Sequence, residues 1–180
     1  YVFDGAKGSP YIETDIPRPL NVYGRTKLEG EQAVRDESPN YWIFRTSWVY
    51  SNRVGGFVNK VLKWAHSQPV VRVVSDQVSG PTWSRMLAEV TALAISMGKS
   101  NLNGWMEGTS GLYHLAGGGY ASRYEWAKAI IENDPQPDKK IIRELIPALS
   151  GDFPTPAQRP LFSALDCSHF ENTLGLALPD

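Results

Sequence analysis

Two side chains near the start of the chain, Tyr23 and Lys27, have the types and the spacing needed for proton transfer to a carbonyl group. They lie four residues apart in residues 21–31 (NVYGRTKLEGE), for which we predict the first turns of a helix, so both share one face, roughly 6 Å apart at Cβ. A phenol titrates near pH 10 in water, and a neighbouring ammonium group lowers that pKa by stabilising the phenolate. Such a tyrosine can protonate a carbonyl oxygen as hydride reaches its carbon, and the lysine keeps donors for a cofactor's ribose hydroxyls.

The pattern alone is not specific, because Tyr124 and Lys128 repeat it. Tyr124 falls in the first turn of a helix that a capping box at residues 122–125 opens, and on the apolar stripe of that helix. We therefore predict that Tyr124 packs in the interior. From spacing alone, Tyr23 and Lys27 are explained equally well as an ordinary aromatic and a solvated lysine on an exposed helix.

Other groupings that could carry chemistry are weaker. His66, His114 and His169 have no partner at metal-ligand spacing, and the single Cys167 excludes an internal disulfide and a multi-cysteine site, so we predict no metal centre. The run GGG at 117–119 lacks the spacing of a nucleotide-binding glycine loop and predicts a strand-to-helix turn that needs positive φ. A G-x-S-x-G nucleophile motif is absent from the sequence.

Alternating strand and helix signals must position these side chains. Runs rich in β-branched and aromatic residues predict strands at 41–46, 70–74, 112–116 and 140–146. Amphipathic spacing predicts helices from Phe57 to before Pro69, at 84–97, after the capping box, and at 167–174. Strands separated by helices indicate an α/β fold with parallel strands covered by helices.

Composition narrows the class of protein. The 180 residues carry 18 basic and 19 acidic side chains, a net charge of -1, which gives no reason to expect nucleic acid or an anionic membrane as a partner. Hydrophobic residues at 42% and charged residues at 21% exclude a disordered chain. We expect a cytoplasmic protein, because no apolar stretch approaches the roughly 18–20 residues that span a bilayer, no signal peptide is visible, and a single cysteine fits a reducing compartment.

A series of motifs, in order along nearly the whole chain, resembles one family. The segments are YVFDG at 1–5, YIETD at 11–15, PLNVYGRTKLEGE at 19–31, RTSWVY at 45–50, DQVSGPT at 76–82, LYHLAG at 112–117 and PTPAQRP at 154–160. As a set they resemble the dTDP-4-dehydrorhamnose reductase family, which belongs to the extended short-chain dehydrogenase/reductases that act on nucleotide sugars. The resemblance implies the C-terminal part of a Rossmann-type, NAD(P)-binding parallel sheet plus a small mixed α/β substrate-binding region. We expect residues 1–75 to belong to the dinucleotide-binding core with its catalytic helix, and residues 76–180 mostly to the substrate-binding region, interleaved with the last core elements.

The resemblance also implies roles at the cofactor. Tyr23 matches the family's catalytic acid, and Lys27 matches its partner, which also holds the nicotinamide ribose. Thr46 and Ser47 would lie beside the nicotinamide, just past the end of a strand, where such folds bind ligands. The cofactor would be NADPH or NADH, and the sequence does not decide between them.

Two aromatic residues are implied at the sugar. Tyr1 matches a tyrosine that lines the sugar pocket, and Trp48 matches an aromatic that contacts the hexose, where an apolar ring face is well suited. The implied reaction reduces the 4-keto group of dTDP-4-dehydro-L-rhamnose to dTDP-L-rhamnose, with the proton coming from Tyr23. The implied partner is therefore a nucleotide sugar, and the oligomeric state stays open, with a homodimer as one option.

Two departures from the family pattern change what is expected of this chain. The glycine-rich fingerprint, the first strands of the Rossmann sheet and the catalytic Ser/Thr that would precede Tyr1 are missing from the sequence, so the cofactor's pyrophosphate lacks its helix N-terminus. We therefore expect a C-terminal portion that cannot reduce the sugar by itself. Phe162 precedes Ser163 where the family has Asn before Ser, so we expect no polar nucleotide contact from that position.

Three other interpretations are open. The regulatory β subunit of methionine adenosyltransferase, a non-catalytic binding protein, resembles the same family and retains the Y-x-x-x-K helix, but lacks a tryptophan at the position of Trp48. Another nucleotide-sugar enzyme, an epimerase or a 4,6-dehydratase, is the second, and a dehydratase normally carries acidic residues beside its catalytic Thr, upstream of this sequence. A fragment with only an interaction role is the third.

Overall fold

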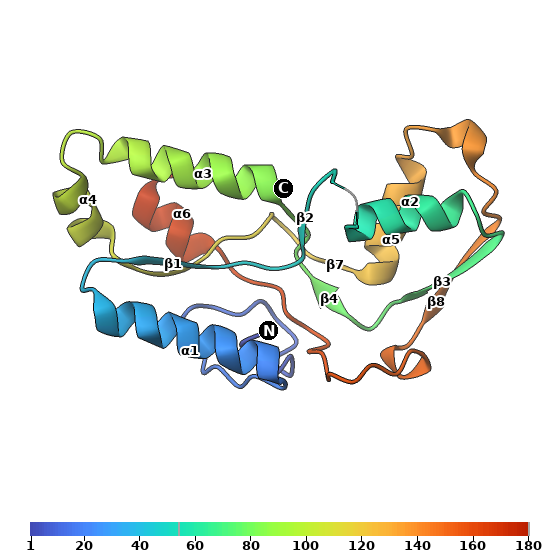
Figure 1. Ribbon diagram of the computed structural model, residues 1–180, viewed down its shortest axis with the longest axis horizontal. Helices are drawn as coiled ribbons and strands as arrows, with labels where there is room; N and C mark the ends of the chain where they lie inside the picture. Colours follow the sequence, from blue (N-terminus) through green and yellow to red (C-terminus); the bar gives the residue numbers. More distant parts are fainter. Residues whose placement is uncertain (54, 180) are drawn as a thin grey trace.

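The computed structural model describes residues 1–53 and 55–179 and shows two groups of elements side by side in an elongated molecule (Figure 1). The first group, here the α1 lobe, contains α1 (Val22–Glu37), β1 (Trp42–Arg45), α3 (Ser84–Met97), α4 (Leu102–Thr109), β6 (Gly111–His114) and α6 (Ser168–Leu174). The second group, the α5 lobe, contains α2 (Phe57–Ala65), β3 (Val70–Val74), α5 (Arg123–Glu132) and β8 (Glu144–Ala148). Four short strands lie between them: β2 (Val49–Tyr50), β4 (Val78–Ser79), β5 (Thr82–Trp83) and β7 (Ala121–Ser122).

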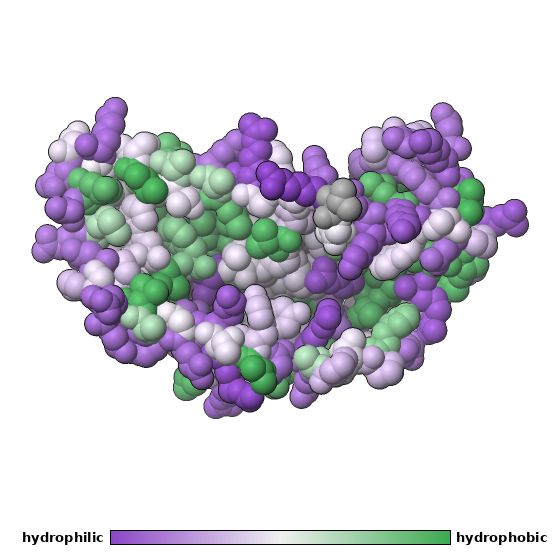
Figure 2. All heavy atoms as spheres, in the orientation of Figure 1, coloured by the Kyte–Doolittle hydropathy of each residue, from purple (hydrophilic) through white to green (hydrophobic). Residues whose placement is uncertain are grey.

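The α1 lobe is built on the parallel pair of β1 and β6, with Trp42 opposite Gly111 and Arg45 opposite His114. α1 lies on one side of this pair and α3 on the other (Figure 1). The core of the lobe joins residues of α3, β6 and α6: Ala94, Tyr113, Leu115, Phe170 and Leu174. Apolar side chains also gather between α3 and β1 on the face seen in Figure 2.

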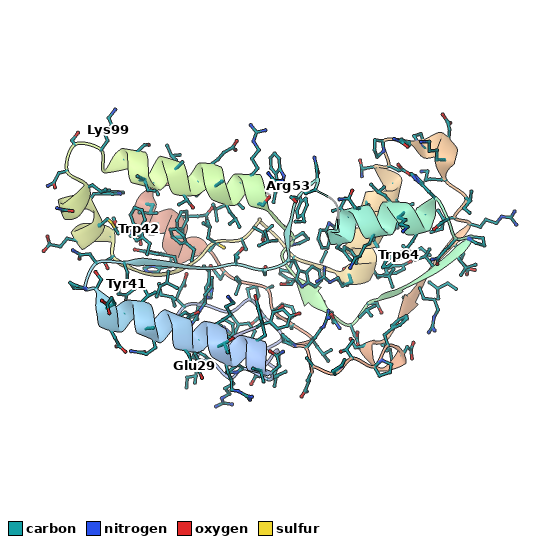
Figure 3. All side chains as sticks on the ribbon, in the orientation of Figure 1. Glu29, Tyr41, Trp42, Arg53, Trp64 and Lys99 are labelled. Carbon is teal, nitrogen blue, oxygen red and sulfur yellow. The ribbon has the colours of Figure 1, made fainter. Side chains whose placement is uncertain are left out.

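The α5 lobe is built on a second parallel pair, β3 with β8. Alternation along β3 buries Val71 and Val73 and leaves Arg72 exposed, as expected for a strand with one covered face. α2 and α5 cover that face, and Trp64 lies on the side of α2 toward β3 (Figure 3). The lobe therefore has its own apolar core, which includes Ala127 of α5.

Between the lobes, β2 pairs with β5 in parallel and β4 pairs with β7 in antiparallel. A third apolar cluster holds the start of the chain, where Phe3 stacks on Tyr11 with ring centroids 4.1 Å apart. Leu28 of α1 packs against this cluster. The first residues are thus fixed in position beside α1, which matters for the candidate site.

Most sequence predictions of elements are confirmed. The α/β class with parallel strands is confirmed, and the strand at 70–74 and the helix at 84–97 have the predicted bounds. The capping box is present, because Ser122 and Glu125 exchange hydrogen bonds at the start of α5. The turn at 117–119 also forms as predicted, with Gly119 at φ 66°.

One predicted strand needs correction, and one helix was not predicted. The strand predicted at 140–146 runs from Glu144 to Ala148 instead, because the N–H groups of Ile141 and Ile142 both bond to the carbonyl of Ala65 at the end of α2. The helix α4 was not predicted, since its two glycines weaken the helical signal.

Two further predictions concern membrane-spanning segments and the division of the chain into regions. Among the described residues, no helix is long and apolar enough to cross a membrane. The division of the chain at residues 75 and 76 stays a prediction, and both lobes contain elements from each side of it.

Candidate active site

α1 begins at an asparagine cap and is attached to the rest of the lobe at a few points. Asn21 Oδ1 accepts a hydrogen bond from the N–H of Gly24 at 2.8 Å, which satisfies one of the free donors at the helix start. Farther along, Arg45 donates from Nε and Nη2 to the two carboxylate oxygens of Glu31, at 2.8 and 2.7 Å. Both side chains of this pair are largely buried, so this two-point contact fixes α1 against the end of β1.

Gly24 allows the first turn of α1 to lie against Tyr1. It is the buried residue of α1, and a Cβ atom added there would collide with the backbone oxygen of Tyr1. Gly30, later on the same helix, has open space around it. The close approach at Gly24 therefore requires glycine, and it brings Tyr1 next to Tyr23.

Tyr1, Tyr23 and Lys27 lie together at this point. The rings of Tyr1 and Tyr23 meet edge to face, with centroids 5.3 Å apart and planes at 85°. Lys27 Nζ lies 5.5 Å from the centroid of the Tyr23 ring. Tyr23 is 57% exposed, and within the described residues neither its hydroxyl nor the Lys27 ammonium is engaged in a hydrogen bond or ion pair. Both groups are therefore available to a ligand.

An open pocket of about 760 Å³, here the tyrosine pocket, lies at the start of α1. Its walls are Tyr1, Tyr23, neighbouring residues of α1 and the segment 156–159. Asn21 holds that segment in place, because its Nδ2 donates to the carbonyl oxygen of Gln158 at 2.7 Å. The residue that caps α1 thus also closes one side of the pocket.

A larger pocket of about 1050 Å³, here the basic pocket, lies between α2, β3 and the segment 150–161. The two pockets share residues 157–159, so they adjoin. Among the described residues that line the basic pocket none is acidic, and four are basic: Lys60, Arg72, Arg123 and Arg159. Its aromatic walls are Phe57, Trp64 and Phe153. This combination suits an anionic ligand with a flat ring system.

Thr46, Ser47 and Trp48, predicted at the cofactor and the sugar, follow β1 directly. Thr46 is exposed, and Ser47 Oγ donates to the carbonyl oxygen of Gly80 at 2.8 Å. Trp48 has a positive φ of 37°, and its ring stacks on Trp126 with centroids 5.6 Å apart. None of the three predicted residues is among those that line the two pockets.

The second tyrosine–lysine pair has a different environment. Tyr124 is half-buried in the core of the α5 lobe, and its hydroxyl donates to the carbonyl oxygen of Leu145 at 3.4 Å. Lys128 lies on the exposed side of α5, with Nζ 3.9 Å from a carboxylate oxygen of Glu132. The prediction that Tyr124 packs in the interior is confirmed.

The histidines and the cysteine serve structural contacts. His66 Nε2 lies 2.6 Å from Asp134 Oδ2, a contact that joins the end of α2 to the segment after α5. His114 is fully buried, and that burial lowers its pKa. Burial also raises the pKa of the Cys167 thiol to about 11, which disfavours the reactive thiolate. In the part of the chain that the structure describes, no three side chains of the metal-binding types come together.

Sequence reasoning missed three residues of the site, namely Asn21, Arg123 and Arg159. The asparagine before a predicted helix was a signal for a cap. No local pattern indicates its bond to Gln158, because the two residues are 137 positions apart. The basic residues are brought together only by the fold.

Known proteins match this chain over its whole length. The dTDP-4-dehydrorhamnose reductase of Sinorhizobium fredii is 40% identical over 181 residues, which are 100% of this chain and 60% of that protein. The crystal structure of a dTDP-4-dehydrorhamnose reductase from Clostridium acetobutylicum has a TM-score of 0.85 at 32% identity. The match covers 100% of this chain and 59% of that chain. The structure of the Bacillus anthracis dTDP-4-dehydrorhamnose reductase in complex with NADP has a TM-score of 0.82 at 27% identity, with 99% of this chain and 58% of that chain covered.

These similarities confirm the family and the fold that the motifs predicted. The chain spans about three fifths of the length of the curated relatives that it matches. A family model described as the RmlD substrate binding domain matches residues 1–180. The chain therefore belongs to the RmlD substrate-binding-domain family.

Proposed function

We propose that this protein reduces the 4-keto group of dTDP-4-dehydro-L-rhamnose to dTDP-L-rhamnose with NADPH or NADH. The observation that carries the proposal is the grouping of Tyr1, Tyr23 and Lys27. Among the described residues the Tyr23 hydroxyl and the Lys27 ammonium make no hydrogen bond or ion pair, and both tyrosines line a pocket. The names of the relatives support the same reaction.

The residues present fit the nicotinamide-ribose end of such a cofactor. Lys27 has an exposed ammonium group without an ion pair among the described residues, so its donors can bond to ribose hydroxyls. The Bacillus anthracis relative was solved with NADP, which favours that form of the cofactor for this protein. We also propose that Thr46 and Ser47, which follow β1 directly, lie beside the nicotinamide.

The proposed mechanism uses the chain's own residues for the proton and for orientation. When bound, the cofactor supplies a hydride to the carbonyl carbon of the sugar. Tyr23 donates its hydroxyl proton to the carbonyl oxygen, and Lys27 stabilises the phenolate that is left. Tyr1, edge to face with Tyr23, forms a wall of the pocket that holds the sugar ring. We also propose that Trp48, whose ring lies against the Arg123 guanidinium at the edge of the basic pocket, contacts the hexose.

The basic pocket supports a nucleotide as the remainder of the substrate. Arg72 is paired with Asp152, so Lys60, Arg123 and Arg159 are the basic side chains that can balance the negative charge of a diphosphate, and the aromatic walls suit a base. Because it shares residues 157–159 with the tyrosine pocket, one ligand can reach both. This arrangement favours a nucleotide sugar over a free sugar.

The alternatives differ in what they do with the same site. A regulatory binding protein would leave Tyr23 and Lys27 without a chemical role, whereas an epimerase would return its hydride to the sugar. The similarity to the Sinorhizobium fredii reductase favours the reductase over both. The cytoplasmic location and the homodimer stay predictions.

The test is an assay of the full natural-length protein with purified dTDP-4-dehydro-L-rhamnose and NADPH. The proposal predicts one NADPH oxidised for each dTDP-L-rhamnose formed, with the product identified by mass spectrometry and NMR. A protein that binds the nucleotide sugar but oxidises neither NADPH nor NADH would contradict it. A product epimerised without net cofactor consumption would establish the second alternative instead.

A further inference from the structure

Arg123, the first residue of α5, carries a guanidinium group enclosed by aromatic rings. Its Cζ lies 3.6 Å from the ring centroid of Trp48, 4.8 Å from that of Phe57 and 5.5 Å from that of Trp126. Its own backbone N–H is bonded to the carbonyl oxygen of Gln77 at 3.0 Å, which fixes the start of the side chain. The charged group is thus held in one place.

Three other arginines in the described residues also lie over aromatic rings, and each has a carboxylate partner. Arg45 lies over Phe3 and pairs with Glu31. Arg72 lies over Phe153 and pairs with Asp152 at 2.6 Å. The third is Arg85, over Trp83 and paired with Glu89 at 2.6 Å. Arg123 has the closest ring contact of the four, and it makes no ion pair with any carboxylate that the structure describes.

The electrostatic surroundings of Arg123 favour an anion. Burial, and then the nearby charge of Arg159, lower its pKa to about 10, whereas the Tyr1 phenol acts in the opposite direction. The group therefore stays protonated at neutral pH, with a charge that no described carboxylate balances. An enclosed charge without a partner is costly. A bound anion there would therefore offset both the desolvation of Arg123 and its repulsion by Arg159.

The position of Arg123 identifies the anion. Arg123 lines the basic pocket, and Arg159 lines both the basic pocket and the tyrosine pocket. A group bound between these two arginines thus lies where the pockets adjoin, between the space for a base and the space beside Tyr23. In a nucleotide sugar, the group between base and hexose is the diphosphate.

We propose that Arg123 and Arg159 together bind the diphosphate of the nucleotide-sugar substrate, with Arg123 as the specificity-determining residue because the rings of Trp48, Phe57 and Trp126 fix its guanidinium plane. The inference rests on the proposed function. A planar guanidinium bonds two phosphate oxygens at once, which a lysine cannot do. Trp48 is in contact with the same guanidinium, so diphosphate binding also fixes the ring that the sugar meets.

The test is calorimetric titration of the full natural-length protein with thymidine, thymidine 5′-monophosphate and thymidine 5′-diphosphate. Arg123→Gln should weaken diphosphate binding by about 10–100-fold, since hydrogen bonds to charged groups contribute about 1.5–3 kcal/mol each. Thymidine and NADPH binding should change less than threefold, and Arg123→Lys should recover part of the loss. The matched control is Arg85→Gln, which removes a ring-stacked arginine outside both pockets and should leave all affinities unchanged.

Steady-state kinetics supply a second readout, in which Arg123→Gln raises KM for the nucleotide sugar far more than it lowers kcat. Equal diphosphate affinity in the wild type and Arg123→Gln would overturn the inference, as would an equal loss of thymidine and diphosphate binding. A wild type that binds thymidine 5′-diphosphate through Arg123 without any turnover would sink the proposed reaction and leave this assignment standing. A wild type with no affinity for the diphosphate would contradict both.

Discussion

The chain contains the same tyrosine–lysine spacing twice, on α1 and on α5, and the two helices place it in opposite environments. On α1, Tyr23 is exposed, its hydroxyl makes no hydrogen bond with any residue that the structure describes, and Lys27 lies over its ring. On α5, Tyr124 is part of an apolar core, its hydroxyl is bonded to a carbonyl group, and Lys128 pairs with a surface glutamate. Spacing provides two side chains on one face of a helix, but chemistry also requires that their polar ends have no other partner.

The difference follows from how each helix is attached. α1 has one buried residue, Gly24, and is held at its cap, at Leu28 and at Glu31, so the face with Tyr23 stays open. α5 packs against both α2 and β3 with its apolar stripe covered, so its tyrosine contributes to packing. A helix that carries reactive groups can thus be held firmly at a few points without being enclosed.

The largest expected difference is between Tyr23→Phe and Tyr124→Phe in the full natural-length protein. Removing the proposed proton donor should lower kcat by about 10²–10⁴-fold, the usual contribution of a positioned acid. Tyr124→Phe should leave kcat unchanged and lower the free energy of unfolding by less than about 1 kcal/mol, because it removes one long hydrogen bond. Steady-state kinetics and chemical denaturation measure the two effects. Comparable losses of kcat in both variants would remove the distinction between the helices.

Replacing the two lysines, Lys27 and Lys128, should produce a smaller difference in kcat than replacing the two tyrosines. Lys27→Met should lower kcat by about 10–100-fold, because it removes charge-assisted bonds to the ribose and to the phenolate. Lys128→Met removes an exposed pair with a 3.9 Å separation and should change stability by no more than a few tenths of a kcal/mol. NADPH affinity, measured by fluorescence, should fall for Lys27→Met alone. The idea fails if both variants retain full activity.

The two glycines of α1 have opposite surroundings, because Gly24 packs against the backbone of Tyr1 and Gly30 has open space around it. Gly24→Ala should destabilise the protein by about 1–3 kcal/mol and reduce activity, because the new Cβ pushes α1 away from the backbone of Tyr1. Gly30→Ala should raise the free energy of unfolding by about 0.5–1 kcal/mol, since alanine is the better helix former and nothing lies nearby. Thermal unfolding of both variants measures the opposite signs. A stabilising Gly24→Ala would contradict the close approach.

The contribution of Asp134 to the free energy of unfolding should decrease in acid. Burial by itself raises the pKa of this carboxyl. Hydrogen bonds from the Gln136 N–H and from His66 lower the pKa by more than burial raises it, so the net shift of the pKa is downward. A lowered pKa in the folded state means that the stabilisation is complete above the unfolded value near 4 and is lost as the pH falls below it. Asp134→Asn should therefore cost about 1–2 kcal/mol at pH 7 and progressively less below about pH 4. Urea denaturation across pH 3–8 measures the change, and a cost that does not narrow in acid would rule out the carboxylate as its source.

Features of the fold and of the site could be predicted from the sequence only where they depend on residues that are close together in the chain. Local signals predicted α1 with Tyr23 on it, the strand β3, the helix α3 and the capping box of α5, because each depends on neighbours within a few residues. The bond from Asn21 to Gln158 and the grouping of Arg123 with Trp48 could not be predicted, since they join distant segments. The capping box and the apolar stripe predicted that Tyr124 packs in the interior, but only the motif resemblance gave Tyr23 a catalytic role.

The most direct test of the central claim, that the pair on α1 performs the chemistry, is a crystal structure of the full natural-length protein with dTDP-L-rhamnose and NADP. We predict that the sugar's 4-hydroxyl lies within hydrogen-bond distance of the Tyr23 hydroxyl, about 2.6–3.2 Å, with the ring against Tyr1 and the base in the basic pocket. A sugar bound away from Tyr23, or a 4-hydroxyl directed toward another acid, would contradict it.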